Sequence, residues 1–193
     1  MSIIDLLSKK EKKHLIYRNL EKGAVLFHES DQCRYIGIIC KGEVSIISYL
    51  DDGKEIIYNT IQQDGIFGNN LIFSSEPYYK GDIIADSDSI IALISKNDLI
   101  DILQNNKEFF KEYLKIQSDS SKALNNRIRL LSIASAEERF RFYMHENRNR
   151  VAYDSIEHLA RKMYLTRETL ARLLSRLEKN SSIIRENKVI ILK

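Results

Sequence analysis

The residues between Leu165 and Leu177 have the types and spacing of a helix that presents charged groups to a ligand. Thr166 can cap this helix, because its hydroxyl accepts hydrogen bonds from first-turn N–H groups that have no partner inside the helix. The apolar residues recur at helical spacing and predict a buried stripe, made of Leu170, Leu173, Leu174 and Leu177. The charged side chains that remain can reach base edges and phosphates.

Six polar side chains of this segment are candidate DNA contacts: Thr166, Arg167, Glu168, Thr169, Arg172 and Arg176. A simpler interpretation is a solvated helix face, on which Glu168 pairs with Arg172 four residues later. The flanking sequence favours the DNA-binding interpretation, because it predicts the other parts of a DNA-binding module.

A second short helix is predicted immediately upstream. Segment 154–157, Asp-Ser-Ile-Glu, has the form of a capping box, so we expect a helix from residue 156 to about residue 163. Residues 164–166 then form a three-residue turn, which is typical of a helix-turn-helix. Downstream, residues 182–185 and 189–192 predict a small terminal hairpin, or wing.

The segment 151–193 resembles the winged helix-turn-helix of the Crp/Fnr family of bacterial transcription regulators. The reading helix of that family commonly carries an Arg-Glu pair followed four residues later by Arg, a pattern that Arg167, Glu168 and Arg172 match. The resemblance implies that the arginines contact guanines and that Glu168 accepts from a cytosine amine. Tyr164 departs from the family, which usually has glycine at this turn position. The turn therefore requires a left-handed tyrosine or a different geometry.

Composition divides the 193-residue chain into two parts. All 7 glycines and the single proline lie before residue 82, which indicates turn-rich β structure first and helices afterwards. Residues 1–95 carry 10 basic and 14 acidic side chains, whereas residues 137–193 carry 13 basic and 8 acidic ones. A basic C-terminal part favours contact with a phosphate backbone.

The N-terminal half predicts a small antiparallel roll or barrel. Short strand-like runs cover residues 24–27, 35–39, 43–48, 55–61 and 89–94. Asp51-Asp-Gly53 predicts a hairpin turn, because these residue types tolerate positive φ angles. Residues 5–20 predict a short helix that packs against the roll.

This half resembles a cyclic-nucleotide-binding β-roll, through residues 22–26, 36–44 and 64–68. The predicted fold class is α+β. An antiparallel β-roll of the double-stranded β-helix or jelly-roll type forms a sensor domain at residues 1–105, a dimerisation helix and hinge follow at 106–134, and a winged helix-turn-helix occupies 135–193.

The resemblance also bears on the effector. The family's phosphate-binding cassette has a Phe-Gly-Glu turn and, some ten residues later, an Arg-Ser or Arg-Ala pair, but here Asn69 follows Phe67-Gly68 and Tyr79-Lys80 replaces the pair. The ribose acceptor and the phosphate fork are both missing, so cyclic AMP is not expected. Lys80 can still attract another small anion; otherwise the loop is a surface turn. The candidate effector pocket is Gly68, Asn69, Tyr79, Lys80, Leu124 and Asn125, where the last two take the place of residues on the family's long helix that touch the nucleotide base.

Other cofactors are not expected either. Cys33 and Cys40 cannot supply the four thiolates of the iron-sulfur clusters that some family sensors use, and haem is not expected. The four histidines are scattered, so no metal site is predicted. The chain shows no signal peptide and no segment of about 20 apolar residues, which predicts a cytoplasmic protein that does not contact a membrane.

Residues 109–131 predict a helix of roughly 35 Å with a coiled-coil seam. The seam positions are Phe110, Leu114, Gln117, Ser121, Leu124, Ile128 and Leu131. We expect this seam to form a homodimer, in which Gln117 and Ser121 are soft spots; the alternative is that the stripe packs only on its own roll. Ser135 and Glu138 form another capping box, which predicts a helix to about residue 147 and a hinge at residues 132–135.

These patterns predict a sequence-specific transcription regulator that binds a palindromic site in double-stranded DNA as a homodimer. Its further partners would be a small-molecule effector and, for an activator, RNA polymerase. An enzyme of the cupin type would need a metal cluster on the roll, where His28 stands alone. The alternative function is a sensor module that acts through protein partners rather than DNA.

Overall fold

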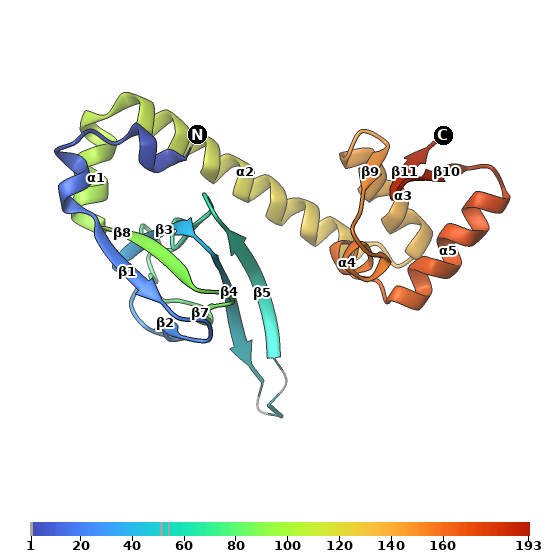
Figure 1. Cartoon of the computed structure of the whole chain (residues 1–193), viewed down its shortest axis with the longest axis horizontal. Helices are drawn as coiled ribbons and strands as arrows, with labels where there is room; N and C mark the ends of the chain where they lie inside the picture. Colours follow the sequence, from blue (N-terminus) through green and yellow to red (C-terminus); the bar gives the residue numbers. More distant parts are fainter. Residues whose placement is uncertain (1, 51, 54) are drawn as a thin grey trace. The chain divides into compact units, whose positions relative to one another are not determined.

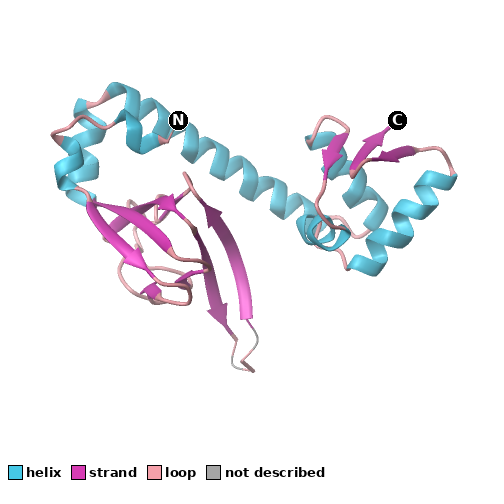
Figure 2. Cartoon of the chain, in the orientation of Figure 1, coloured by secondary structure: helices cyan, strands magenta, loops and turns pink. Residues whose placement is uncertain are grey.

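The computed structural model describes residues 2–50, 52–53 and 55–193. The chain forms two compact units, Met1–Ser118 and Asp119–Lys193 (Figure 1). Strands dominate the first unit, and helices with a small sheet make up the second (Figure 2). The predicted α+β class is confirmed. The finer division at residues 105 and 134 stays a prediction.

The first unit contains two four-stranded antiparallel sheets. Their strand orders are β1-β8-β3-β6 and β2-β7-β4-β5. The strands are β1 (Ile16–Leu20), β2 (Val25–Phe27), β3 (Tyr35–Lys41), β4 (Glu43–Tyr49), β5 (Glu55–Gln62), β6 (Ile66–Phe67), β7 (Asp82–Ala85) and β8 (Ser89–Ser95). Buried side chains of β3, β6, β7 and β8 share one core, so the strands form a roll.

All five predicted strand-like runs are strands, and β1, β6 and β7 are additional. Asp51 of the predicted hairpin turn lies outside the described residues. Gly53 lies in a turn with φ +80°, and its N–H donates to the Leu50 carbonyl at 2.8 Å. This is the backbone conformation for which glycine is suited.

The predicted helix over residues 5–20 is wrong. Two single-turn 3-10 helices, Ile3–Leu6 and Glu11–His14, precede strand β1 there. β1 pairs with β8 from Ile16 opposite Leu93 to Leu20 opposite Ser89. This ladder satisfies backbone groups of the long, largely buried β8, and a helix over the same residues would leave those groups unpaired.

Helix α1 (Lys96–Asn105) follows the roll, and α2 (Lys107–Ser132) is the predicted long helix. The N-terminal part of α2 buries Phe109 and Tyr113 in the core of the first unit. Its C-terminal part belongs to the second unit, where Asn126 donates to Glu146 at 2.7 Å and the Arg129 guanidinium lies 4.6 Å from the centre of the Phe142 ring. The long helix is therefore confirmed, with ends within two residues of the prediction.

The remaining elements of the second unit are α3 (Ala136–Glu146), β9 (Arg150–Ala152), α4 (Ile156–Lys162), α5 (Arg167–Lys179), β10 (Ile183–Glu186) and β11 (Val189–Leu192). β10 and β11 are the predicted hairpin, and the unpredicted β9 adds a third antiparallel strand in the order β10-β11-β9. α3, α4 and α5 pack with this sheet around one core. Within the described residues, no helix is both long and apolar enough to cross a lipid bilayer.

Gly37 on β3 lies opposite Phe67 on β6 and gives a test of the roll. A Cβ atom at Gly37 would lie 2.0 Å from Cζ of the Phe67 ring. We expect Gly37→Ala to lower the free energy of unfolding by about 1–3 kcal/mol through overpacking, measured by urea denaturation.

The control is a second change at the contacted ring. In the Gly37→Ala background, Phe67→Leu should recover part of the lost stability, although Phe67→Leu alone is destabilising. Additive losses in the double variant would contradict the predicted contact.

Candidate functional site

Helix α4 ends in a turn that leads directly into α5. The Tyr164 N–H donates to the Arg161 carbonyl at 3.1 Å, and the Leu165 N–H donates to the Ala160 carbonyl at 3.0 Å. Tyr164 has φ 55°, so these bonds form a Schellman motif with tyrosine at the left-handed position. Of the two geometries considered for this turn, the structure has the left-handed tyrosine.

Side-chain contacts hold this turn in place. The Arg139 guanidinium on α3 donates to the Tyr164 carbonyl at 3.0 Å and also to the carbonyl of Ile133. The Arg127 guanidinium lies 5.4 Å from the centre of the Tyr164 ring. Arg139 thus connects the non-helical residues after α2 to the turn that precedes α5.

The two caps differ in how well they were predicted. Thr166 caps α5 as expected, and its hydroxyl accepts from the Thr169 N–H at 3.1 Å. The cap of α4 is Ser155 rather than Asp154, since the Ser155 hydroxyl accepts from the His158 N–H at 3.1 Å. Asp154 instead lies 3.7 Å from Nδ1 of His158. The predicted cap was therefore one residue too early, and Glu157 is not part of a capping box.

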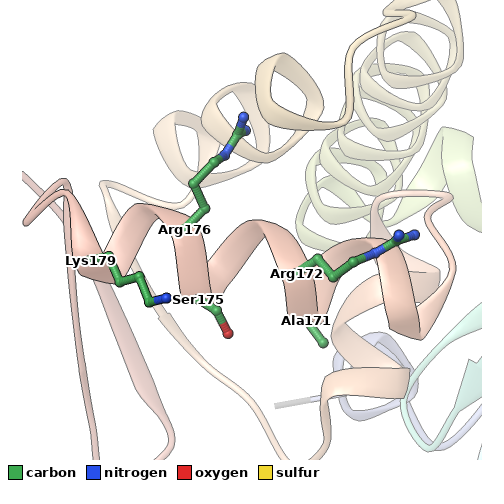
Figure 3. Close-up of a pocket in the computed structure, with 5 residues that line it drawn as sticks. All are labelled: Ala171, Arg172, Ser175, Arg176 and Lys179. Carbon is green, nitrogen blue, oxygen red and sulfur yellow. The ribbon is translucent and has the colours of Figure 1, made fainter.

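The apolar stripe of α5 is buried as predicted. Its members are Leu170, Leu173, Leu174 and Leu177, each at most 5% exposed. Because this stripe faces the core, the polar side chains are directed to the surface: Thr166, Arg167, Glu168, Arg172 and Arg176 are exposed, and Thr169 is half-buried. Figure 3 shows several side chains of α5 that line a shallow surface hollow, among them Arg172, Ser175 and Lys179.

The charged residues of α5 differ in their partners. Within the described residues, Arg172 and Glu168 form no ion pair with each other or with any other group, so the solvated-pair interpretation has no support here. Arg176 does have a partner, because its guanidinium lies 2.6 Å from a carboxylate oxygen of Glu137 on α3. On α4, a hydrogen bond from Arg161 lowers the pKa of Glu157, and the nearby charge of Arg167 adds to this.

The hairpin of β10 and β11 closes through Asn187 and Lys188. These residues have φ 48° and 58°, and the flanking Glu186 and Val189 are paired. Two successive left-handed residues are typical of a type I′ turn, the connection that suits twisted antiparallel strands. The turn carries the charge of Lys188 at the end of the predicted wing.

In the first unit, the loop after β6 contains the predicted effector residues Gly68 and Asn69. Gly68 has φ +76°, and a Cβ atom there would lie 2.7 Å from the Tyr35 carbonyl. Asn69 is only 5% exposed, and its side-chain N–H donates to Gln117 on α2 at 2.5 Å. In return, the Gln117 amide donates to the Asn69 carbonyl at 2.8 Å. Gln117 was predicted as a seam residue, and here its amide is engaged by the loop of its own chain.

The two other predicted pocket residues of this unit differ in exposure to solvent. Tyr79 is 3% exposed, stacks on Phe27 with ring centres 4.9 Å apart, and donates to the Tyr35 carbonyl at 3.1 Å. Lys80 is exposed. Leu124 and Asn125 belong to the second unit, and their part in a pocket stays a prediction.

The apolar seam positions of α2 are exposed in the single chain. Phe110, Leu114, Leu124, Ile128 and Leu131 have between 42% and 56% of their surface exposed. In each unit, the apolar residues of the predicted seam therefore do not pack into that unit's own core.

Residues 17–106 match the family described as Cyclic nucleotide-binding domain. This segment, slightly less than half of the chain, is therefore similar to that family. The chain is also 28% identical over 112 residues to the anaerobic regulatory protein of Bacillus subtilis, an alignment that covers 58% of this chain. It covers 47% of the relative, so the match spans about half of that protein's length.

The fold extends this likeness beyond residues 17–106. A CooA mutant from Carboxydothermus hydrogenoformans superposes with TM-score 0.69 at 18% identity, covering 100% of this chain and 92% of that one. The Thermus thermophilus catabolite activator protein gives TM-score 0.57 at 14% identity, covering 99% and 93%. FixK2 from Bradyrhizobium japonicum gives 0.58 at 19% identity, covering 93% and 92%. The predicted resemblance to Crp/Fnr-type regulators is confirmed at the level of the fold.

Several residues with contacts to the predicted sites were missed. Glu137 and Arg139 on α3 contact Arg176 and the Tyr164 carbonyl, which lie 39 and 25 positions away in the chain. No local spacing signals such pairs. The described residues contain no group of three or more His, Cys, Asp or Glu side chains placed to hold a metal ion.

The Asn69–Gln117 contact gives a test of the packing of α2 against the first unit. The Tyr113 hydroxyl lies 3.4 Å from both the Gln117 amide and the Asn69 carbonyl, and burial raises its pKa to about 12. Asn69→Ala removes the donor to the Gln117 side-chain oxygen, and Gln117→Ala removes both hydrogen bonds between the two residues. Each of these bonds contributes about 0.5–1.5 kcal/mol.

We therefore expect Asn69→Ala and Gln117→Ala to be non-additive in a double-mutant cycle of urea denaturation. The coupling energy should be about 0.5–3 kcal/mol. A matched cycle that combines Asn69→Ala with Lys115→Ala, on an exposed side of α2, should give no coupling. Equal coupling in both cycles would contradict a direct role for Gln117.

Proposed function

We propose that this protein is a sequence-specific, DNA-binding transcription regulator that acts in the cytoplasm and not as an enzyme. The observation that carries the proposal is the surface of α5, where a buried leucine stripe leaves Arg167, Glu168 and Arg172 exposed beside the cap at Thr166. Arg172 has no ion pair among the described residues, so its guanidinium is available for a forked contact with a guanine.

In this proposal α5 enters the major groove as the second helix of a winged helix-turn-helix. Arg167 and Arg172 contact guanines, Glu168 accepts from a cytosine amine, and Thr166 and Thr169 contact the backbone beside them. The basic composition of the second unit supports the proposal, because Lys and Arg neutralise phosphates along the duplex. The hairpin of β10 and β11 is the wing.

The functional form is proposed to be a homodimer that binds a palindromic site. Exposed apolar side chains at heptad spacing along α2 support this, because they would bury their surface against a second copy of the helix. Two-fold symmetry would place the two reading helices about 34 Å apart, one turn of DNA.

The proposed sensor does not use cyclic AMP. Asn69 takes the place of the family's glutamate, and its amide is already bonded to Gln117. Tyr79 stands where the family has an arginine and is stacked on Phe27. A small acidic or apolar ligand of another kind would act through the hinge after α2, which sets whether the two α5 helices match successive grooves. For an activator, RNA polymerase is the further partner.

The first test is selection of binding sites from a random duplex pool, followed by anisotropy titrations with wild type and Arg172→Ala. We expect the variant to lose about 1–3 kcal/mol on the selected site and to relax preference at one base pair of each half-site. Lys179→Ala, at the opposite end of α5, is the control and should retain preference at every base pair.

Two results would count against the proposal. Equal loss on selected and scrambled duplexes would remove Arg172 as a base reader. Failure of the wild type to enrich any site, together with weak dependence of binding on salt, would favour a module that acts through protein partners.

The dimer is tested by Leu124→Glu on the seam. A charge at this position would face the partner helix, so we expect dissociation to monomers in sedimentation velocity and weaker binding to the palindrome. Lys122→Glu introduces the same side chain at another exposed position of α2 and should remain dimeric. A monomeric wild type, or a dimeric Leu124→Glu variant, would contradict the proposed seam.

A further inference from the structure

Two arginines on α5, Arg172 and Arg176, lie one turn apart on the same side of the helix. Both line a hollow between α5 and the start of α3, together with Glu137 and Thr169. Only Arg176 forms an ion pair across this hollow, among the residues that the structure describes. In Figure 3 its side chain points away from Ala171 and Ser175, which lie on the other side of the helix. Of these two arginines on one side of α5, Arg176 therefore has a carboxylate partner and Arg172 has none among the described residues.

The occupying group is the Glu137 carboxylate, in the first turn of α3. One of its oxygens lies 2.6 Å from Arg176, and the other accepts from Nε of Arg141 at 3.0 Å. The side chain of Glu137 is 31% exposed, compared with 60% for Arg176. Both oxygens thus have a cationic donor, and the carboxylate is the more enclosed partner.

This arrangement has an electrostatic consequence. Arg176 can reach a DNA phosphate only by leaving Glu137. The Glu137 carboxylate would then lose this charge-assisted hydrogen bond while it lies beside the negatively charged DNA. The side chains of Arg176, Arg141 and Glu137 together carry one net positive charge. Neutralising Glu137 would release Arg176, which lines the same hollow as Arg172, and would also release Arg141. Each phosphate that these cations neutralise strengthens binding to any sequence.

The geometry points to Glu137 as a residue that withholds Arg176 from DNA and so limits sequence-independent affinity. This inference rests on the proposed DNA-binding function. Arg176 is then a positioning residue that ties α5 to α3, and base reading belongs to Arg167, Glu168 and Arg172. Sequence specificity increases because Arg176, if released, would contact a phosphate, and phosphate contacts carry no sequence information.

The test compares Glu137→Gln with Glu138→Gln in the full-length protein. Glu138 is exposed, lies in the same helical turn, and forms no ion pair among the described residues. Both variants remove one negative charge, but only Glu137→Gln releases arginines. Affinity for a selected duplex and a scrambled duplex is measured over a series of salt concentrations, with thermal unfolding as the check on folding.

Glu137→Gln should bind the scrambled duplex at least threefold more tightly than Glu138→Gln does. The slope of log K against log salt should be steeper by about 0.9 for each additional phosphate that the variant neutralises. Arg176→Gln in the wild type should change affinity for the selected duplex less than twofold. Combined with Glu137→Gln, it should lower the affinity for the scrambled duplex below that of Glu137→Gln alone, because only Arg141 is then released.

Equal behaviour of the two glutamate variants would overturn the inference. A tenfold loss of affinity of Arg176→Gln for the selected duplex, with relaxed preference at one base pair, would also overturn it. This variant decides the question even if Glu137→Gln unfolds. A wild type that prefers no sequence overturns the proposed function instead, and this result is distinguishable because the scrambled duplex still compares the two glutamate variants.

Discussion

The burial of the α5 leucines is the constraint on which the candidate DNA-binding surface depends. Leu170, Leu174 and Leu177 are at most 2% exposed and pack with α3, α4 and the three-stranded sheet. A helix has one rotational position that buries such a stripe, so the directions of Arg167 and Arg172 follow from the core. The left-handed turn at Tyr164 then fixes where that helix begins. Packing and turn geometry together set the directions of Arg167 and Arg172, and the contacts of Arg139 hold the turn itself.

The loop after β6 separates backbone conformation from hydrogen-bonding chemistry. Gly68 keeps the tight approach of the loop to β3, which no residue with a side chain could make without displacing the Tyr35 carbonyl. Asn69 directs its amide to Gln117 rather than to a ligand. The fold of the loop and its ligand chemistry are therefore separable, since backbone conformation depends on Gly68 and hydrogen-bonding capacity on its neighbour.

Sequence predicted the features that depend on local periodicity and capping. α2 and α5 have apolar residues at helical spacing, and Thr166 and Ser135 cap their helices as expected. The error over residues 5–20 arose because β1 is defined by pairing with β8, whose partner residues lie 69 to 77 positions away. The Glu137–Arg176 ion pair was missed for the same reason: its partners meet only after α3 and α5 have packed together.

The continuity of α2 has a consequence for how such chains can evolve. Each residue advances a helix by about 100°, so a single insertion near Ser118 would shift Leu124, Ile128 and Leu131 out of the heptad spacing that they share with Phe110 and Leu114. Substitutions along α2 would be tolerated far more often than insertions or deletions. An insertion of about seven residues would keep the predicted heptad spacing, because seven residues return the helix to within about 20° of its starting direction. We therefore expect this helix to tolerate changes in length that keep the heptad spacing, whereas its residues can change one at a time.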